Sequence, residues 1–231
     1  MKTKINKESR NLLIALCLGD GTISSNNVMK LSHSINQEDY LKWKINLLNE
    51  HGLRNNGIKY YTSKCGYNIG KTVCYTQLNI IPFIKMLRKI MYKPIKSYTK
   101  LINRIDEQGL AIWYMDDGHL NNRKYADGSY HGFYIKISTC LPKVQCEEII
   151  QKIYDKFNVK FYTFHEGRKQ DSFSLCCGTK EAKKFIKIVK PFVEQIPSML
   201  YKVTPLGEVP STCKSEDIVW SLSKGKVNIN G

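Results

Sequence analysis

Two short apolar segments, each closed by aspartate and glycine, constrain this chain more than any other feature. Residues 13–21 and 110–118 are apolar, helix-forming stretches that end on Asp20–Gly21 and Asp117–Gly118, 97 positions apart. One such ending would carry little information, because glycine commonly terminates helices. The repeated ending predicts a duplicated unit that presents two carboxylates.

The repeat continues beyond these segments. Residues 82–93 align without gaps on residues 191–202, with Pro, Phe, Tyr and Lys at matching places, and residues 30–32 align on residues 136–138. The matches occur in the same order, while their offset grows from 97 to 106 to 109. We therefore predict two related halves, 1–104 and 105–231, joined by a crossover within 94–106.

Hydrophobic periodicity predicts the same order of elements in each half. Helical spacing indicates motif helices over 7–20 and 107–117, the second capped by Asp106. Alternation of apolar and polar residues predicts strands, and a 3.6-residue period predicts the intervening helices. The ranges are strands at 29–34, 58–62 and 71–76 with a helix at 37–50, then strands at 134–139, 159–164 and 172–177 with a helix at 142–156. A closing helix carries the Pro-Phe element, so the predicted fold is α+β with the order αββαββα twice; residues from about 203 show no periodicity.

The charge of the chain predicts a polyanionic partner. The formal net charge is +16, and nucleic acid is the commonest partner of a folded domain this basic. Residues 1–106 carry +12 and residues 107–231 carry +4, so the first half is expected to contribute more of the salt dependence. A basic protein without such a partner is the alternative.

The cysteines and the N-terminus bear on the compartment. Eight cysteines occur without any Cys-x-x-Cys pair, which favours reduced thiols over zinc binding or disulfides. The apolar run at 12–18 has only seven residues and leads into Asp20, so it predicts a helix of the mature protein and no membrane partner. An intracellular location with reduced thiols is expected, in a bacterial or phage cytoplasm or an organelle matrix.

Paired acids at helix ends suit metal chemistry. A helix C-terminus carries partial negative charge, so an aspartate there is locally unfavourable and needs another reason. Two adjacent carboxylates provide oxygen ligands for a hard cation such as Mg²⁺, which lowers the pKa of bound water and neutralises charge on a phosphodiester. Ala15 and Gly19 give the first helix a smooth contact face, whereas Ile112 and Asp116 stand at the equivalent places of the second. The alternative is two core helices with glycine stops.

Both segments resemble the motif of the LAGLIDADG homing endonucleases, in the single-chain form with two motifs. The resemblance implies two pseudo-symmetric halves packed through the motif helices, with antiparallel sheets that form a saddle. It makes Asp20 and Asp117 the catalytic, metal-binding acids, with Gly19 and Asp116 contributing main-chain carbonyls to the metal. It implies two or three Mg²⁺ ions, which Mn²⁺ can replace. The side chain of Asp116 has no assigned role.

The resemblance also implies a catalytic lysine near the end of each half. Lys202 lies in a matching Ser-Met-x-Tyr-Lys stretch, and the gapless internal alignment makes Lys93 its partner, with Lys96 as a nearby competitor.

DNA contacts are expected on the polar faces of the strands, which in this family lie in the major groove. Lysine and arginine reach base edges and phosphates there, and aromatic residues add contact area. The candidates on or between predicted strands are Lys30, Ser32, Lys59, Tyr61, Lys64, Lys71, Tyr75, Tyr134, Lys136, Ser138, Lys160, His165, Arg168 and Lys169. The other histidines, at 33, 51, 119 and 131, show no ligand spacing and are expected to be packing or surface residues.

The resemblance implies a monomer that binds a long, asymmetric double-stranded DNA site and makes a staggered double-strand cut. An RNA-binding intron maturase and a non-cleaving DNA-binding regulator on the same scaffold are the alternatives. Loss of the metal-binding acids tends to mark both, and here both acids are present.

Overall fold

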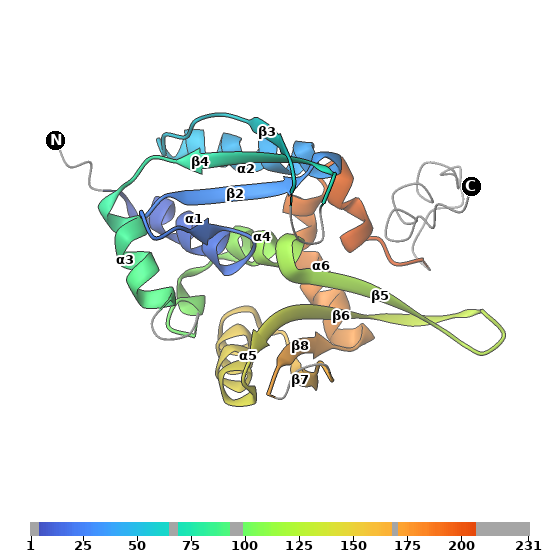
Figure 1. Cartoon of the computed structure of the whole chain (residues 1–231). Coiled ribbons are helices and arrows are strands. Elements are labelled where there is room, and N and C mark those ends of the chain that lie inside the picture. Colours follow the sequence, from blue (N-terminus) through green and yellow to red (C-terminus); the bar gives the residue numbers. More distant parts are fainter. Residues whose placement is uncertain (1–4, 65–68, 93–98, 168–170, 207–231) are drawn as a thin grey trace.

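The computed structural model describes residues 5–64, 69–92, 99–167 and 171–206. Figure 1 shows two halves, each a sheet with its helices, and two central helices between them. The first half consists of α1 (Lys7–Leu18), β1 (Thr22–Ile23), β2 (Met29–Ser34), α2 (Glu38–Glu50), β3 (Lys59–Thr62), β4 (Thr72–Leu78) and α3 (Pro82–Met91).

The second half repeats this order. It consists of α4 (Glu107–Asp117), β5 (Gly118–Lys124), β6 (Tyr130–Leu141), α5 (Lys143–Phe157), β7 (Tyr162–His165), β8 (Phe173–Cys177) and α6 (Thr179–Val193). A 3₁₀ turn follows the last helix of each half, η3 (Ile102–Arg104) and η4 (Pro197–Lys202). The predicted order αββαββα is confirmed in both halves.

The two sheets have the same topology. Both are antiparallel and four-stranded, with the orders β1-β2-β4-β3 and β5-β6-β8-β7. Burial alternates along β2 and along most of β6, as predicted for strands with one packed face. Identical strand order in both sheets confirms the duplication and the α+β class.

The central helices α1 and α4 pack against each other and are buried along most of their length. Their close approach depends on small residues of both helices. A Cβ added to Gly109 of α4 would lie 3.2 Å from the Cβ of Ala15 of α1. The positions of α4 equivalent to Ala15 and Gly19 hold the larger residues Ile112 and Asp116. Gly109 is the small residue that α4 contributes.

The closing turn of each half packs on a helix of the other half. The backbone N–H of Ser198 in η4 donates to Asp39 of α2 at 2.9 Å. Reciprocally, Lys156 of α5 donates to the carbonyl of Asn103 in η3 at 3.3 Å. These reciprocal contacts join the halves in addition to the central helices.

Several sequence-based predictions need correction. Helix α1 ends at Leu18, so Asp20 lies beyond it. The initial strands β1 and β5 were not located from the sequence. Pro82 opens α3, whereas Pro191 lies near the end of α6, so the gapless alignment of 82–93 with 191–202 joins different elements. That alignment was the basis for Lys93, which lies with Lys96 outside the described residues. Among the described helices, none is long and apolar enough to cross a membrane.

Candidate active site

The two motif acids lie at the C-terminal ends of the central helices. Asp117 is the last residue of α4, and Asp20 follows Gly19, the C-cap of α1. The N–H of Gly21 returns to the carbonyl of Leu16 at 2.9 Å. A Cβ on Gly21 would come within 3.0 Å of that carbonyl oxygen, and one on Gly118 would come equally close to Tyr114. Both positions therefore require glycine, because the chain turns tightly onto its own helix after each acid and leaves no room for a side chain.

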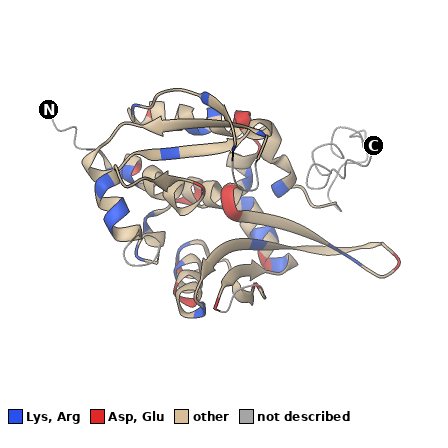
Figure 2. Ribbon diagram, viewed as in Figure 1, with Lys and Arg blue, Asp and Glu red and all other residues tan. Residues whose placement is uncertain are grey.

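The acids differ in exposure. Asp20 is exposed, with 46% of its side chain accessible, whereas Asp117 is less accessible and only partly exposed. Figure 2 shows the acidic end of α4 at the centre of the molecule, between the two sheets. The charges of Asp20 and Asp117 both act on the pKa of Lys202, so the three groups share one electrostatic environment.

Lys202 is buried at the end of α4, with 3% of its surface exposed. Its Nζ donates to the carbonyls of Met115 and Gly118, the latter at 3.0 Å, and Tyr114 donates to the Lys202 carbonyl at 2.6 Å. An ammonium group there offsets the partial negative charge of the helix end. Burial lowers the pKa of Lys202 to about 8, although the nearby aspartates act in the opposite direction. The structure therefore brings the sequence-predicted Lys202 close to the acids.

The side chain of Asp116 is fully buried and forms an ion pair with Lys44 of α2, whose side chain is also fully buried. Lys44 Nζ lies 2.7 Å and 2.9 Å from the two carboxylate oxygens, and the hydroxyl of Tyr40 donates to one of them at 2.8 Å. The other oxygen accepts the backbone N–H of Asp20 at 3.0 Å. Burial alone raises the pKa of Asp116, but the charge of Lys44 and the hydrogen bonds from Lys44 and the Asp20 N–H outweigh it, and the pKa is lowered.

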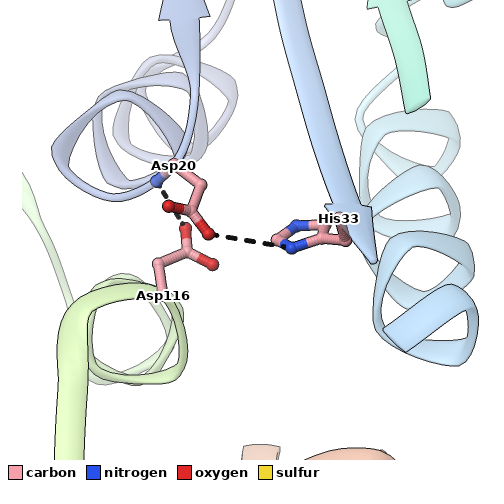
Figure 3. A group of neighbouring side chains, drawn as sticks. All are labelled: Asp20, His33 and Asp116. Carbon is pink, nitrogen blue, oxygen red and sulfur yellow. Dashed lines mark hydrogen bonds and ion pairs between the residues drawn. The ribbon is translucent and has the colours of Figure 1, made fainter. Parts of the chain in front are cut away.

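His33 of β2 completes the cluster (Figure 3). Its Nε2 lies 3.1 Å from Lys44 Nζ, and its Nδ1 lies 3.7 Å from an Asp20 oxygen. Burial, followed by the charge of Lys44, lowers the pKa of His33 to about 3, so the ring is neutral at pH 7 and forms no ion pair with Asp20. An ammonium group can only donate, so Nε2 is the acceptor and the ring proton is on Nδ1, facing Asp20.

The sequence analysis missed the role of His33. Burial was among the expected outcomes, but the contact with Asp20 and Lys44 was not. The sequence pattern that indicates its burial is the alternation of β2, in which His33 shares the buried face with Met29 and Leu31.

Asp20, His33 and Asp116 offer three ligand atoms within 4.8 Å of one another. A cation between them would lie beside the Lys44 ammonium, and the oxygens of Asp116 already accept hydrogen bonds from Lys44, Tyr40 and Asp20. Carboxylate oxygens such as those of Asp20 and Asp117 are ligands that a hard cation prefers. The side chain of Asp116 therefore acts as a partner of Lys44 rather than a ligand.

The first sheet brings together most of its predicted DNA-contacting residues. The register pairs Ser32 with Tyr75 and Tyr75 with Lys59, which places them on one face. Lys30 Nζ lies 4.5 Å from the ring centroids of both Tyr61 and Tyr75, within range of a cation–π contact. Lys64 and Lys71 are exposed between β3 and β4.

The second sheet brings together fewer of them. Tyr134, Lys136 and Ser138 share the half-exposed face of β6, and Lys136 forms an ion pair with Glu166 at 2.8 Å. The alternation of β7 places His165 on the other face, where its ring lies 5.0 Å from Phe173. The following two predicted residues, Arg168 and Lys169, lie outside the described part of the chain.

Lys160 lies outside both sheets. It precedes β7, and its Nζ lies 5.5 Å from the ring centroid of Tyr154 on α5. Strand β5 instead adds residues that the sequence analysis did not select. His119 and Asn121 pair with Lys136 and Tyr134 and share their face.

A family model described as the LAGLIDADG DNA endonuclease family matches residues 10–185, which is most of the chain. The chain belongs to this family. The sequence-based resemblance to this family is thereby confirmed.

The chain is also similar to curated proteins and to a solved structure. The intron-encoded endonuclease ai4 of Dictyostelium discoideum is 32% identical over 126 residues, 52% of this chain and 65% of that protein. Protein RecA of Mycolicibacterium flavescens is 24% identical over 225 residues, 90% of this chain and 49% of that protein. The chain thus spans about half the length of that RecA. The homing endonuclease I-WcaI bound to its DNA recognition sequence superposes with a TM-score of 0.69 at 20% identity over 88% of both chains, which shows a shared fold.

Proposed function

We propose that this LAGLIDADG protein is a site-specific homing endonuclease that makes a staggered double-strand cut by Mg²⁺-dependent phosphodiester hydrolysis. One observation carries the proposal: two aspartates lie at the C-terminal ends of the paired central helices, between two sheets whose polar faces carry lysine and tyrosine. Each half contributes one acid, and a double-strand cut requires the hydrolysis of two strands.

The duplex site is inferred to be long and asymmetric. Both halves are present in one chain, so a monomer can contact both half-sites. The two faces differ: Lys30 lies beside two tyrosine rings in the first sheet, whereas Lys136 is paired with Glu166 in the second. Different faces read different base edges, so the two half-sites are expected to differ in sequence.

The acids would hold the divalent cations. Asp20 and Asp117 supply carboxylate oxygens, with the carbonyls of Gly19 and Asp116, and Mn²⁺ is expected to replace Mg²⁺. When bound, the cations would lower the pKa of the attacking water and neutralise charge on the phosphate. Lys202 contributes positive charge beside the same acids, and its lowered pKa of about 8 favours exchange of a proton near neutral pH.

An intron RNA-binding maturase and a non-cleaving DNA-binding regulator would use the same basic faces without needing the acids. Both acids are present and lie next to a buried lysine, which favours cleavage over these alternatives.

The cysteines support a reducing compartment as the site of action. The six in the described residues are Cys17, Cys74, Cys140, Cys146, Cys176 and Cys177, and no disulfide joins any two of them. Disulfides form and persist in oxidising compartments, so we place the protein inside a cell or organelle.

Selection from a randomised duplex library tests the proposal. Duplexes retained by the protein in Ca²⁺ would be sequenced, and the enriched pool would then be incubated with Mg²⁺. The proposal predicts one long asymmetric motif, cut on both strands at staggered positions. Retention of a motif without cutting would support the regulator instead, and preferential retention of intron RNA would support the maturase.

A further inference from the structure

The two motif acids are supported differently. Asp116 and Gly19 occupy equivalent positions before Asp117 and Asp20, respectively. The carboxylate of Asp116 accepts the backbone N–H of Asp20 at 3.0 Å, across the interface between the halves (Figure 3). Glycine has no side chain, so Gly19 cannot return such a bond to Asp117. A side-chain bond from this position of the motif therefore reaches Asp20 but not Asp117.

The groups that hold the Asp116 carboxylate come from the first half. Lys44 contacts both of its oxygens at 2.7 Å and 2.9 Å, and Tyr40 donates to one at 2.8 Å. The ring of His33 lies behind Lys44, 3.1 Å from its Nζ. With both carboxylate oxygens engaged, Asp116 has little freedom to rotate away from the Asp20 N–H.

Stability alone is a weak explanation for this arrangement. A fully buried ion pair loses hydration on both sides, and hydrophobic residues of similar volume often replace one without loss of stability. What hydrophobic residues cannot provide is an acceptor for the Asp20 N–H. Groups that orient a metal-binding residue in this way typically change metal affinity by about 10- to 100-fold when they are removed.

We propose that Asp116 is a positioning residue: its carboxylate, fixed by Lys44 and Tyr40, holds the backbone of Asp20 in the orientation that binds the cation. The inference rests on the proposed function, because it assigns Asp20 to the cation. It follows that cation binding at Asp20 depends on a residue of the opposite half. Gly19 has no side chain that could hold Asp117 in the same way.

Two double variants separate positioning from packing. Lys44→Met with Asp116→Asn removes the ion pair and keeps an acceptor for the Asp20 N–H. Lys44→Met with Asp116→Leu removes the ion pair and the acceptor, with a side chain of similar shape. A purely structural role predicts that the two variants behave alike. Tyr40→Phe is a third, milder variant that deletes one hydroxyl donor to Asp116.

The readout is Mn²⁺ binding to the protein without DNA, followed by the electron paramagnetic resonance signal of free Mn²⁺. The relevant binding is the part that Asp20→Asn abolishes. We expect the leucine pair to bind Mn²⁺ about 10-fold more weakly than the asparagine pair, and Tyr40→Phe to weaken binding by a smaller factor. Urea unfolding of each variant provides the control for folding.

Equal Mn²⁺ affinity of the two folded double variants would overturn the proposal. If the leucine pair does not fold, Tyr40→Phe decides, and wild-type affinity in that variant would overturn it. In either case target cleavage by the wild-type protein would leave the proposed function intact. Asp20-dependent Mn²⁺ binding without any DNA cleavage would contradict the proposed function alone.

Discussion

The side chain of Asp116 lies directly against Gly19, at the C-terminal ends of the two central helices. A Cβ added to Gly19 would come within 3.0 Å of the carboxylate and Cβ of Asp116. Since Asp116 is held by Lys44, it cannot move aside without breaking a buried ion pair. A methyl group at residue 19 must therefore push the helices apart.

We predict that Gly19→Ala lowers the free energy of unfolding by about 1–3 kcal/mol, the usual cost of overpacking, and slows DNA cleavage. Urea denaturation would measure the first effect. Gly178→Ala is the matched control, because nothing lies within 4 Å of a Cβ there and φ is −76°. Similar losses in both variants would contradict the steric argument.

Lys202→Met should slow cleavage by roughly 100-fold, the typical effect of removing one electrostatic contact at a reacting centre. The variant loses the ammonium that contacts the carbonyls of Met115 and Gly118 beside the acids. Single-turnover cleavage would measure the rate, with DNA affinity measured in Ca²⁺. Lys190→Met, on the exposed side of α6, is the control. A rate equal to that of the control would remove Lys202 from the mechanism.

The buried, neutral His33 should make the protein sensitive to acid. Its pKa is lowered from 6.5 to about 3 on folding, so between these values the unfolded state binds more protons than the folded state. Stability therefore falls as the pH decreases from about 6.5 toward 3, by up to about 1.4 kcal/mol per pH unit from this group.

We expect His33→Gln, which does not titrate, to show a shallower loss of unfolding free energy below pH 6.5 than the wild-type protein. Urea melts at several pH values would measure the slope. His131→Gln, at an exposed histidine of β6, should leave the slope as in the wild type. Parallel pH profiles for His33→Gln and the wild type would show that His33 is protonated in the folded state.

DNA affinity should fall steeply with salt, because lysines and arginines on the sheets displace counterions from phosphates. We predict that Lys30→Ala and Lys59→Ala each reduce the affinity for DNA, and that loss of a phosphate contact also lowers the salt slope by about one. Fluorescence anisotropy over a salt series would measure both quantities. An affinity that does not change with salt would contradict nucleic-acid binding by these faces.

The sequence was sufficient for the features that depend on local periodicity. The strands β2 and β6 alternate clearly, and the motif helices are recognisable from apolar runs that end in Asp–Gly. The strand β1 has only two residues, too few to show a period, and β5 begins directly at Gly118 without a turn signal. These short or unpunctuated strands needed the structure.

The environment of Asp116 could not be predicted from the sequence. Its partner Lys44 is 72 positions away, on a helix of the other half, and no sequence spacing relates them. The similar residues around Pro82 and Pro191 gave an incorrect alignment of the two halves. Pro82 begins α3, whereas Pro191 lies near the end of the longer helix α6.

The central claim is that Asp20 and Asp117 together support hydrolysis of both DNA strands. The most direct test is the cleavage rate of the selected duplex in Mg²⁺ by the wild-type protein, Asp20→Asn and Asp117→Asn, with binding measured in Ca²⁺. We predict a staggered double-strand cut by the wild type, and no double-strand cut by either variant although both still bind the duplex. A double-strand cut at the wild-type rate by either variant, or by the wild type in the presence of a chelator, would contradict the account.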